Sequence, residues 1–251
     1  MRGLISAAAS LRTLANGLIA VLLAPPCAAC DAPLDQPTRS PVCASCWAQL
    51  RPFTPPLCRH CGDPLPSWRV ISLQSATCAR CRRLPTAISQ SRAIGSYEGT
   101  LRSIIHALKY DKRQSLARPL GELLRHECPQ VLIGVDVVVP VPLHRSRLRT
   151  RGFNQAEGIA RGLRLPTSNL LRRVRATVSQ TDLPAARRHA NVRDAFALTR
   201  RAQVAGLRIV LVDDVSTTGA TLEACARLLR EAGAREVRAL TAARVVTRFP
   251  A

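Results

Sequence analysis

The chain of 251 residues is 47% hydrophobic and 21% charged, which is typical of a globular protein and excludes intrinsic disorder as the default. Its 37 Lys and Arg residues against 16 Asp and Glu residues give a net charge of +21, which favours polyanionic partners: nucleic acid first, phosphate-rich small molecules second. An arginine-biased genome would give the same balance. Only 3% of the residues are aromatic, so a stacking platform for single-stranded nucleic acid would be sparse.

The first segment, residues 1–24, is expected to form an amphipathic lead-in helix. Arg2 and the apolar run 18–24 are also compatible with a signal peptide, but Arg12 and Asn16 interrupt the apolar region and favour the helix. No stretch of the sequence approaches the length of a membrane span. The leucines at helical spacing are Leu11, Leu14, Leu18 and Leu22.

Residues 25–90 are rich in Pro, Cys and short polar turns, and are expected to form a Cys-rich double zinc-ribbon module. Two CxxC pairs can surround one tetrahedral Zn²⁺, so four pairs predict two structural zinc ions. Pairing in sequence order and interleaved pairing are both possible, and His60 could replace a ligand. Four disulfides in a secreted domain are the alternative, which the cytosolic character of the remaining chain disfavours. The predicted metal ligands are Cys27, Cys30, Cys43, Cys46, Cys58, Cys61, Cys78 and Cys81.

Residues 91–251 alternate strands and helices as a parallel sheet with crossover helices requires, and predict an α/β domain. Two further cysteines in it, Cys128 and Cys225, are expected to be ordinary buried thiols. Residues 170–200 are rich in arginine and poorly patterned, and are interpreted as a hood. The expected strands are residues 92–97, 135–141, 207–212 and 236–243; the expected helices are residues 154–163 and 219–232, and one that buries Leu101, Ile104, Ile105 and Leu108.

Residues 209–222 read IVLVDDVSTTGATL: an apolar strand, two carboxylates, a hydroxyl-rich turn and a helix. N–H groups at a helix N-terminus bind phosphate, and Gly219 permits close approach or a positive φ. Asp213 and Asp214 can accept hydrogen bonds from two ribose hydroxyls and would lie near a Mg²⁺ carried by pyrophosphate. The turn lacks the GK[ST] ending of a nucleotide triphosphatase loop. The predicted phosphate-binding residues are Ser216, Thr217, Thr218, Gly219, Ala220 and Thr221.

Residues 137–155 read VVVPVPLHRSRLRTRGFNQ, a strand that runs into two prolines and then arginines at alternate positions. In an extended loop these arginines would share one side, where guanidinium groups could pair bidentately with a diphosphate. A solvated basic run is the alternative. The four arginines are Arg145, Arg147, Arg149 and Arg151.

The block DDVSTTGAT resembles the 5-phosphoribosyl-1-pyrophosphate (PRPP) signature of type I phosphoribosyltransferases. Together with the CxxC pairs, the block PVPLHRSRLRTRGFNQ and residues 175–196, it resembles the ComF family of phosphoribosyltransferase-like proteins, which include competence proteins. The resemblance implies a type I phosphoribosyltransferase fold behind a small zinc-ribbon module. It also implies a pyrophosphate loop of Pro140, Val141, Pro142 and Leu143, cationic partners Lys109 and Arg151, and a hood lined by Ser179, Gln180, Arg188 and Asn191.

We therefore expect the chain to bind PRPP with Mg²⁺ and to transfer the phosphoribosyl group to an acceptor that the sequence does not identify. Asp213 and Asp214 would act chiefly by electrostatics. The ComF resemblance implies a role in DNA uptake and natural transformation, with competence or recombination proteins as partners. The alternative is a non-catalytic, PRPP-responsive protein that binds single-stranded DNA. A cytoplasmic location is expected, because PRPP and reduced thiols both occur there.

Overall fold

The computed structural model describes residues 25–65, 76–84, 86–175 and 194–246. The predicted lead-in helix of residues 1–24 therefore lies outside the described residues. The same holds for the residues predicted to line the hood, which are Ser179, Gln180, Arg188 and Asn191.

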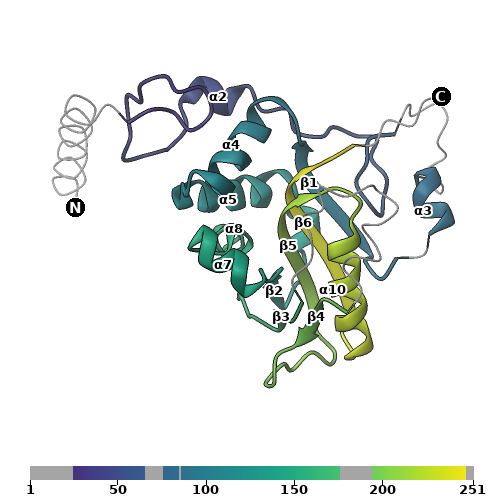
Figure 1. Cartoon of the computed structure of the whole chain (residues 1–251). Coiled ribbons are helices and arrows are strands. Elements are labelled where there is room, and N and C mark those ends of the chain that lie inside the picture. The colour runs from purple at the N-terminus through teal and green to yellow at the C-terminus, as the bar shows by residue number, and fades with distance from the viewer. Residues whose placement is uncertain (1–24, 66–75, 85, 176–193, 247–251) are drawn as a thin grey trace, which may run out of the picture.

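A four-stranded sheet forms the centre of the molecule, with strand order β1-β6-β5-β2 (Figure 1). The strands are β1 (Gln90–Ser96), β2 (Val137–Pro140), β5 (Arg208–Ser216) and β6 (Glu236–Arg244), and every neighbouring pair is parallel. The predicted α/β parallel sheet is thus confirmed. Because the strands are parallel, their carboxyl ends meet at one edge, where open α/β sheets place their ligands.

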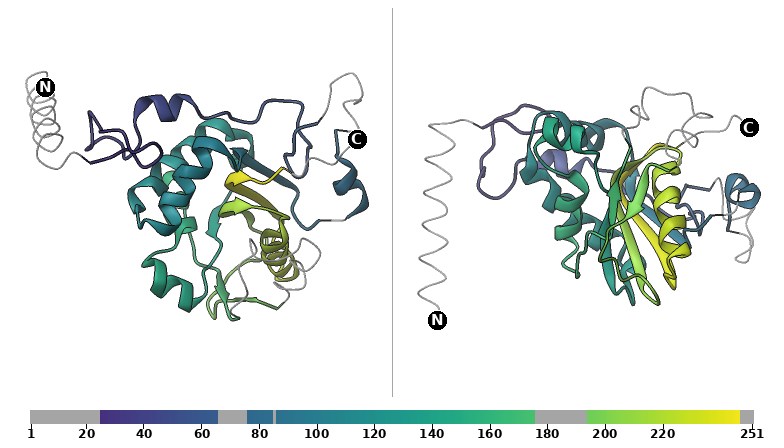
Figure 2. Two further views of the ribbon diagram at one scale, coloured as in Figure 1. Left: turned by 45° about the horizontal axis from the view of Figure 1, so that its top comes forward. Right: turned by 60° about the horizontal axis from the view of Figure 1, so that its bottom comes forward.

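Helices cover both faces of the sheet (Figures 1 and 2). On one face, α4 (Gly99–Tyr110), α5 (Ala117–Glu127) and α8 (Gln155–Gly162) bury their apolar sides. The other face is covered by α10 (Ala220–Glu231). As predicted, α4 buries Leu101, Ile104, Ile105 and Leu108. The shorter helices are α2 (Ala44–Ala48), α3 (Ala79–Arg83), η3 (Gln114–Leu116), α6 (Pro129–Leu132) and α7 (Arg145–Arg151).

Glycines let α5 and α8 cross at close range. A Cβ atom on Gly121 would lie 2.0 Å from the carbonyl oxygen of Ile159, and one on Gly162 would lie 2.4 Å from that of Arg118. Real side chains do not approach so closely, so these positions require glycine. The crossing fixes α8, whose N-terminus lies beside the loop that follows β2.

Part of the segment interpreted as a hood forms a small hairpin. The strands β3 (Leu171–Arg173) and β4 (Phe196–Leu198) pair antiparallel and pack against the face that carries α10. Each strand has three residues, which is too short to leave a periodic pattern in the sequence.

The two halves of the cysteine-rich module lie on different sides of the sheet (Figure 1). Residues 51–53 join them along the edge strand β1, where the N–H of Phe53 donates to the carbonyl of Ile94 at 2.8 Å. The first half packs near α4, and Arg113 donates to the carbonyl of Pro26 at 2.8 Å. The second half lies on the side of α10. The module therefore passes along the edge strand β1 and contacts both faces of the sheet.

Candidate functional site

The acidic pair lies within β5 rather than after it. The strand was expected to end at residue 212, but it continues to Ser216, paired with β6 as far as Arg244. Neighbouring residues of a strand point to opposite faces, so Asp213 and Asp214 leave opposite sides of the sheet. The side chain of Asp214 lies on the face covered by α4, and that of Asp213 lies on the face that carries α10 and β3.

Asp214 forms an ion pair with the lysine that ends α4. Nζ of Lys109 lies 2.8 Å from Oδ1 of Asp214, and both side chains are largely buried. Burial alone would lower the pKa of Lys109, but Asp214 and, more weakly, Asp213 raise it above its ordinary value. The structure therefore brings together two of the predicted site residues that are far apart in sequence.

Asp213 carries a perturbed carboxyl group. Burial and the neighbouring charge of Asp214 raise its pKa to about 7, although Lys109 and Arg173 act in the opposite direction. Arg173 of β3 is a cation near this carboxylate that the sequence analysis did not single out; burial and then Arg147 lower its pKa, and Asp213 opposes them. A carboxyl with a pKa near 7 can exchange a proton at neutral pH.

The hydroxyl-rich turn leads from β5 into α10. Gly219 has φ +77° and precedes the helix, so the predicted positive φ is present, and only glycine adopts it without strain. The N–H of Ala220 donates to Oγ1 of Thr218 at 3.4 Å. Thr217 belongs to this turn, and Thr221 lies in the first turn of α10. The N-terminus of the twelve-residue helix α10 thus opens at the edge that carries the acidic pair.

The predicted pyrophosphate loop follows β2 at the same edge. Its N–H at Val141 donates to the carbonyl of Val212 at 2.9 Å, so the loop starts beside β5. Nδ2 of Asn154 donates to the carbonyl of Val141 at 3.1 Å, while its Oδ1 accepts the N–H of Ala156 and caps α8. Asn154 is buried and therefore pins the loop to the helix. The loop continues through Pro142 and Leu143.

The predicted extended arginine loop is wrong. Residues 145–151 form the helix α7, in which alternate residues do not share a side. His144 caps the helix by accepting the N–H of Ser146, and Gly152 ends it with φ +81°. Arg145 and Arg149 are exposed. Gly152 directly after the run is a C-cap signal, and five of the seven residues of α7 are Arg or Leu, which are good helix formers.

Arg151 turns back from the end of α7 toward the domain. Its guanidinium lies 5.6 Å from the ring centre of Tyr110 and donates to Oε1 of Gln155 at 3.1 Å. Tyr110 follows Lys109 at the end of α4, so this contact places Arg151 at the C-terminal end of the helix that carries Lys109. The structure thus gathers Lys109, Arg151, the acidic pair and both predicted loops at one place.

Two clusters of four cysteines fit tetrahedral zinc. The sulfur atoms of each cluster lie within 4.8 Å of one another, and backbone N–H groups of Cys43 and Cys78 donate to the sulfurs of Cys27 and Cys58. Four converging thiolates are the donor set of a closed structural zinc site. The clusters are Cys27, Cys30, Cys43 and Cys46, and Cys58, Cys61, Cys78 and Cys81.

The clusters decide the pairing that the spacing left open. The CxxC pairs combine in sequence order, first with second and third with fourth, and His60 belongs to neither cluster. Cys128 and Cys225 are buried outside both clusters, as predicted. Within the part of the chain that the structure describes, no helix is long and apolar enough to cross a membrane.

Family models agree with this architecture. Residues 135–247 match the phosphoribosyl transferase domain, and residues 18–82 match the double zinc ribbon domain. The parallel sheet and the two cysteine clusters therefore define a protein of the phosphoribosyltransferase fold with an N-terminal double zinc ribbon, which carries structural zinc.

Relatives identify the family. The chain is 31% identical to competence protein F of Haemophilus influenzae over 208 residues, which cover 78% of this chain and 87% of the relative. It is 33% identical to the DNA utilization protein YhgH of Escherichia coli over 206 residues, with the same coverage, and 27% identical to competence protein ComFC of Bacillus subtilis over 199 residues, with 76% and 79% covered. The chain belongs to this ComF family.

A solved structure of glutamine PRPP amidotransferase from B. subtilis, in complex with ADP and GMP, matches with a TM-score of 0.36 and 29% identity. The match covers 51% of this chain and 26% of that protein, so the matched half of this chain spans about a quarter of the amidotransferase's length.

Proposed function

We propose that the chain binds PRPP with Mg²⁺ at the carboxyl edge of the sheet and transfers the phosphoribosyl group to an acceptor. The observation that carries the proposal is the sequence of groups along one strand and the turn after it. Asp213 and Asp214 are followed by a hydroxyl-rich turn, and this turn opens the N-terminus of α10. These groups are complementary to a ribose phosphate: the carboxylates can accept from the ribose hydroxyls, and the turn and the helix N-terminus can donate to the phosphate.

The two loops take different parts of the ligand in this proposal. The turn before α10 binds the 5-phosphate through backbone N–H groups and hydroxyls. The buried hydroxyl of Ser216 accepts from Arg244 and keeps its own O–H as a donor. Lys109 offsets the charge at Asp214. The proposed phosphate ligands are Ser216, Thr217, Thr218, Gly219, Ala220 and Thr221. The proposed pyrophosphate loop is Pro140, Val141, Pro142 and Leu143, with Lys109 and Arg151 as its cationic partners; Arg145 and Gln180 are further proposed PRPP ligands.

In the proposed reaction an acceptor forms a bond to C1 of the ribose while the bond from C1 to the pyrophosphate oxygen breaks. Pyrophosphate leaves with the bonding electrons. Mg²⁺, when bound with the substrate, would neutralise charge on this leaving group. Asp213 and Asp214 hold the ribose hydroxyls and oppose the positive charge that develops on the ring. With a pKa of about 7, Asp213 is also suited to take the acceptor's proton.

The family supports a role in DNA handling. Relatives carry the names competence protein and DNA utilization protein. We place this chain accordingly in DNA uptake or use, in the cytoplasm, with competence or recombination proteins as partners.

Calorimetric titration of the zinc-replete chain with PRPP and Mg²⁺ tests the binding step. We expect saturable binding, and a loss of roughly a hundredfold or more in the double variant Asp213→Asn/Asp214→Asn. Asp136→Asn is the matched control, because Asp136 accepts from the N–H of Arg208 at the opposite, amino end of β5. A folded wild type that does not bind PRPP would refute the proposal.

A non-catalytic, PRPP-responsive protein that binds single-stranded DNA is the second candidate. It is favoured by the net charge of +21 and by the exposed arginines of α7, Arg145 and Arg149. This function predicts DNA affinity that falls steeply with salt, changes when PRPP is added, and is accompanied by no release of pyrophosphate. The transferase predicts pyrophosphate release that requires an acceptor.

A further inference from the structure

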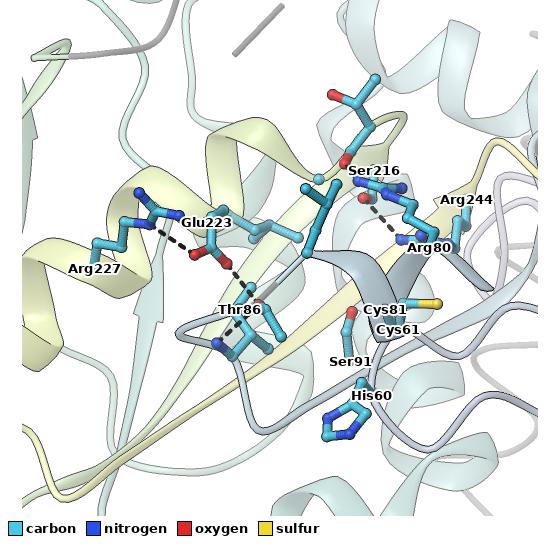
Figure 3. Close-up of a pocket in the computed structure, with 15 residues that line it drawn as sticks. His60, Cys61, Arg80, Cys81, Thr86, Ser91, Ser216, Glu223, Arg227 and Arg244 are labelled. Carbon is cyan, nitrogen blue, oxygen red and sulfur yellow. Dashed lines mark hydrogen bonds and ion pairs between the residues drawn. The ribbon is translucent and has the colours of Figure 1, made fainter. Parts of the chain in front are cut away.

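The strand beside the phosphate-binding turn ends in a buried arginine. Arg244 is the last residue of β6, lies opposite Ser216 in the register of the sheet, and is 4% exposed. Its Nη1 donates to Oγ of Ser216 at 3.2 Å (Figure 3). A buried guanidinium requires a counter-charge, since an unpaired one destabilises the folded state strongly.

The counter-charge comes from the second zinc ribbon, the part of the module that carries Cys58, Cys61, Cys78 and Cys81. Asp63 forms an ion pair with Arg244, with Nε and Nη2 of the guanidinium directed to the two carboxylate oxygens. Asp63 follows Cys61 by two residues, and its carbonyl accepts the N–H of Cys58 at 2.8 Å. Its backbone therefore belongs to the tight loop around the ligand pair Cys58 and Cys61, a zinc knuckle that a bound zinc ion would stabilise.

The knuckle itself rests on β1. The N–H of Ser91 donates to the carbonyl of His60 at 2.5 Å, and Arg92 donates to the carbonyl of Cys58 at 3.2 Å. A Cβ on Gly62 would meet the carbonyl oxygen of Ser91 at 2.7 Å. This close seat leaves Asp63 little freedom to move relative to the sheet.

The other knuckle of the same ribbon reaches the turn directly. Arg80, which lies between Cys78 and Cys81 on α3, donates through Nη2 to the carbonyl of Thr218. The second ribbon and the turn both line a cavity of about 330 Å³. Figure 3 shows Arg80, Arg244 and Ser216 in its lining. Both knuckles of the second ribbon thus contact the turn before α10, one through Arg244 and one without an intermediary.

We infer that Asp63, Arg244 and Arg80 are positioning residues, through which the second zinc ribbon holds the turn of residues 216–221 in its phosphate-binding conformation. The inference rests on the proposed function. It makes the ribbon a component of the PRPP site, although its side chains do not touch the ligand. Coupling of this kind is reciprocal, so PRPP binding would also retain zinc in the second ribbon.

Asp63→Asn tests the inference, because it removes the charge and keeps the shape of the side chain. On the full zinc-replete chain we expect PRPP to bind roughly 10- to 100-fold more weakly, with both zinc ions retained, and Asp63→Glu to restore most of the affinity. Glu236→Gln is the matched control. It breaks a similar two-point ion pair with Arg238 at the amino end of the same strand, and should leave PRPP affinity unchanged within about twofold.

Hydrogen exchange gives a readout that needs no ligand. In the Asp63→Asn variant the amides of residues 216–221 should exchange faster than in the wild type, whereas Glu236→Gln should leave them unchanged. Wild type that binds PRPP, together with an Asp63→Asn variant of equal affinity and equal exchange, would overturn the inference. Wild type that does not bind PRPP, with faster exchange in the variant, would refute only the proposed function.

Arg80→Gln keeps the inference testable if Asp63→Asn loses zinc or unfolds. Arg80 lies between two zinc ligands but supplies none of the sulfur atoms, so its loss leaves the cluster complete. We expect weaker PRPP binding and faster exchange at Thr218 and Gly219. Unchanged values for both would contradict the role of the ribbon.

Discussion

Asp213 and Asp214 are neighbours in sequence but experience different surroundings. Strand geometry turns them to opposite faces of β5, and only Asp214 lies 2.8 Å from the lysine that ends α4. Burial and the charge of Asp214 raise the pKa of Asp213 to about 7. One carboxylate is therefore held in an ion pair with Lys109, while the other, Asp213, has a pKa within the neutral range.

This difference predicts a pH dependence of PRPP binding. Below about pH 7, Asp213 is protonated and accepts hydrogen bonds from ribose hydroxyls less well, so affinity should increase about tenfold from about pH 6 to about pH 8. Calorimetry across this range measures the change.

Asp213→Asn supplies the control, because PRPP also has phosphate groups that titrate. The pH dependence of PRPP affinity that remains in the variant is due to the ligand, and the difference between wild type and variant is due to Asp213. Equal slopes would show that Asp213 does not change its charge in this range.

At the scale of elements, Asn154 links a helix to a ligand loop. One end of its amide caps α8 and the other donates to the carbonyl of Val141. The position of α8 is in turn fixed by the glycines at its crossing with α5, Gly121 and Gly162. The loop after β2 is thus held by the helical layer, whereas the turn after β5 is held by its own helix and by the second ribbon.

Substitutions at Asn154 separate the cap from the loop contact. Asn154→Asp can still accept the N–H of Ala156, but its second carboxylate oxygen would face the carbonyl oxygen of Val141 and cannot donate to it. We therefore expect PRPP affinity to fall about tenfold, and the buried charge to lower the free energy of unfolding as well. Asn154→Ala loses both contacts and should lower the free energy of unfolding by about 1–3 kcal/mol as well. Urea titrations and calorimetry measure the two effects. An Asn154→Asp variant with wild-type affinity would show that the loop does not need this bond.

Sequence patterns predicted the strands of the parallel sheet and the helices α4, α8 and α10, but not the eleven-residue helix α5. The parallel strands and α4 follow from continuous apolar runs and from helical spacing, which are local signals. The helix α7 was missed because its run of arginines has no apolar period, and because His144, which caps it, is not one of the common N-cap residues. The three-residue strands β3 and β4 leave no pattern at all. The boundary near residue 90 stays a prediction.

The site itself was predictable only where a motif is contiguous. The block of residues 213–221 was identified from its order of residue types and its resemblance to the PRPP signature, and the cysteine pairs from their spacing. The contacts of Asp63 with Arg244, and the approach of Arg173 to Asp213, join segments far apart in the chain. Such pairs depend on the register of β6 and on the docking of the ribbon, and a single sequence contains no signal for either.

On the scale of the whole molecule, the two ribbons have different neighbours. The first contacts the first turn of α4, where Gln49 accepts from Thr100, and the loop after α4, where Pro26 accepts from Arg113. The second contacts β1, Arg244 and the phosphate-binding turn. The first zinc site thus supports the region around α4, and the second supports the phosphate-binding turn. We therefore expect loss of the first and of the second zinc ion to affect PRPP binding differently.

Cys30→Ser in the first ribbon and Cys81→Ser in the second should each reduce the zinc content from two ions to one, and each should lower the melting temperature, because a structural zinc ion contributes to folding. Only Cys81→Ser should weaken PRPP binding by about tenfold or more, since Asp63 and Arg80 lose their fixed positions with that ion. Metal analysis, thermal melting and calorimetry on the same samples measure all three quantities. Equal losses of PRPP affinity in the two variants would mean that zinc supports the site only through overall stability, and that the ribbons are interchangeable in this respect.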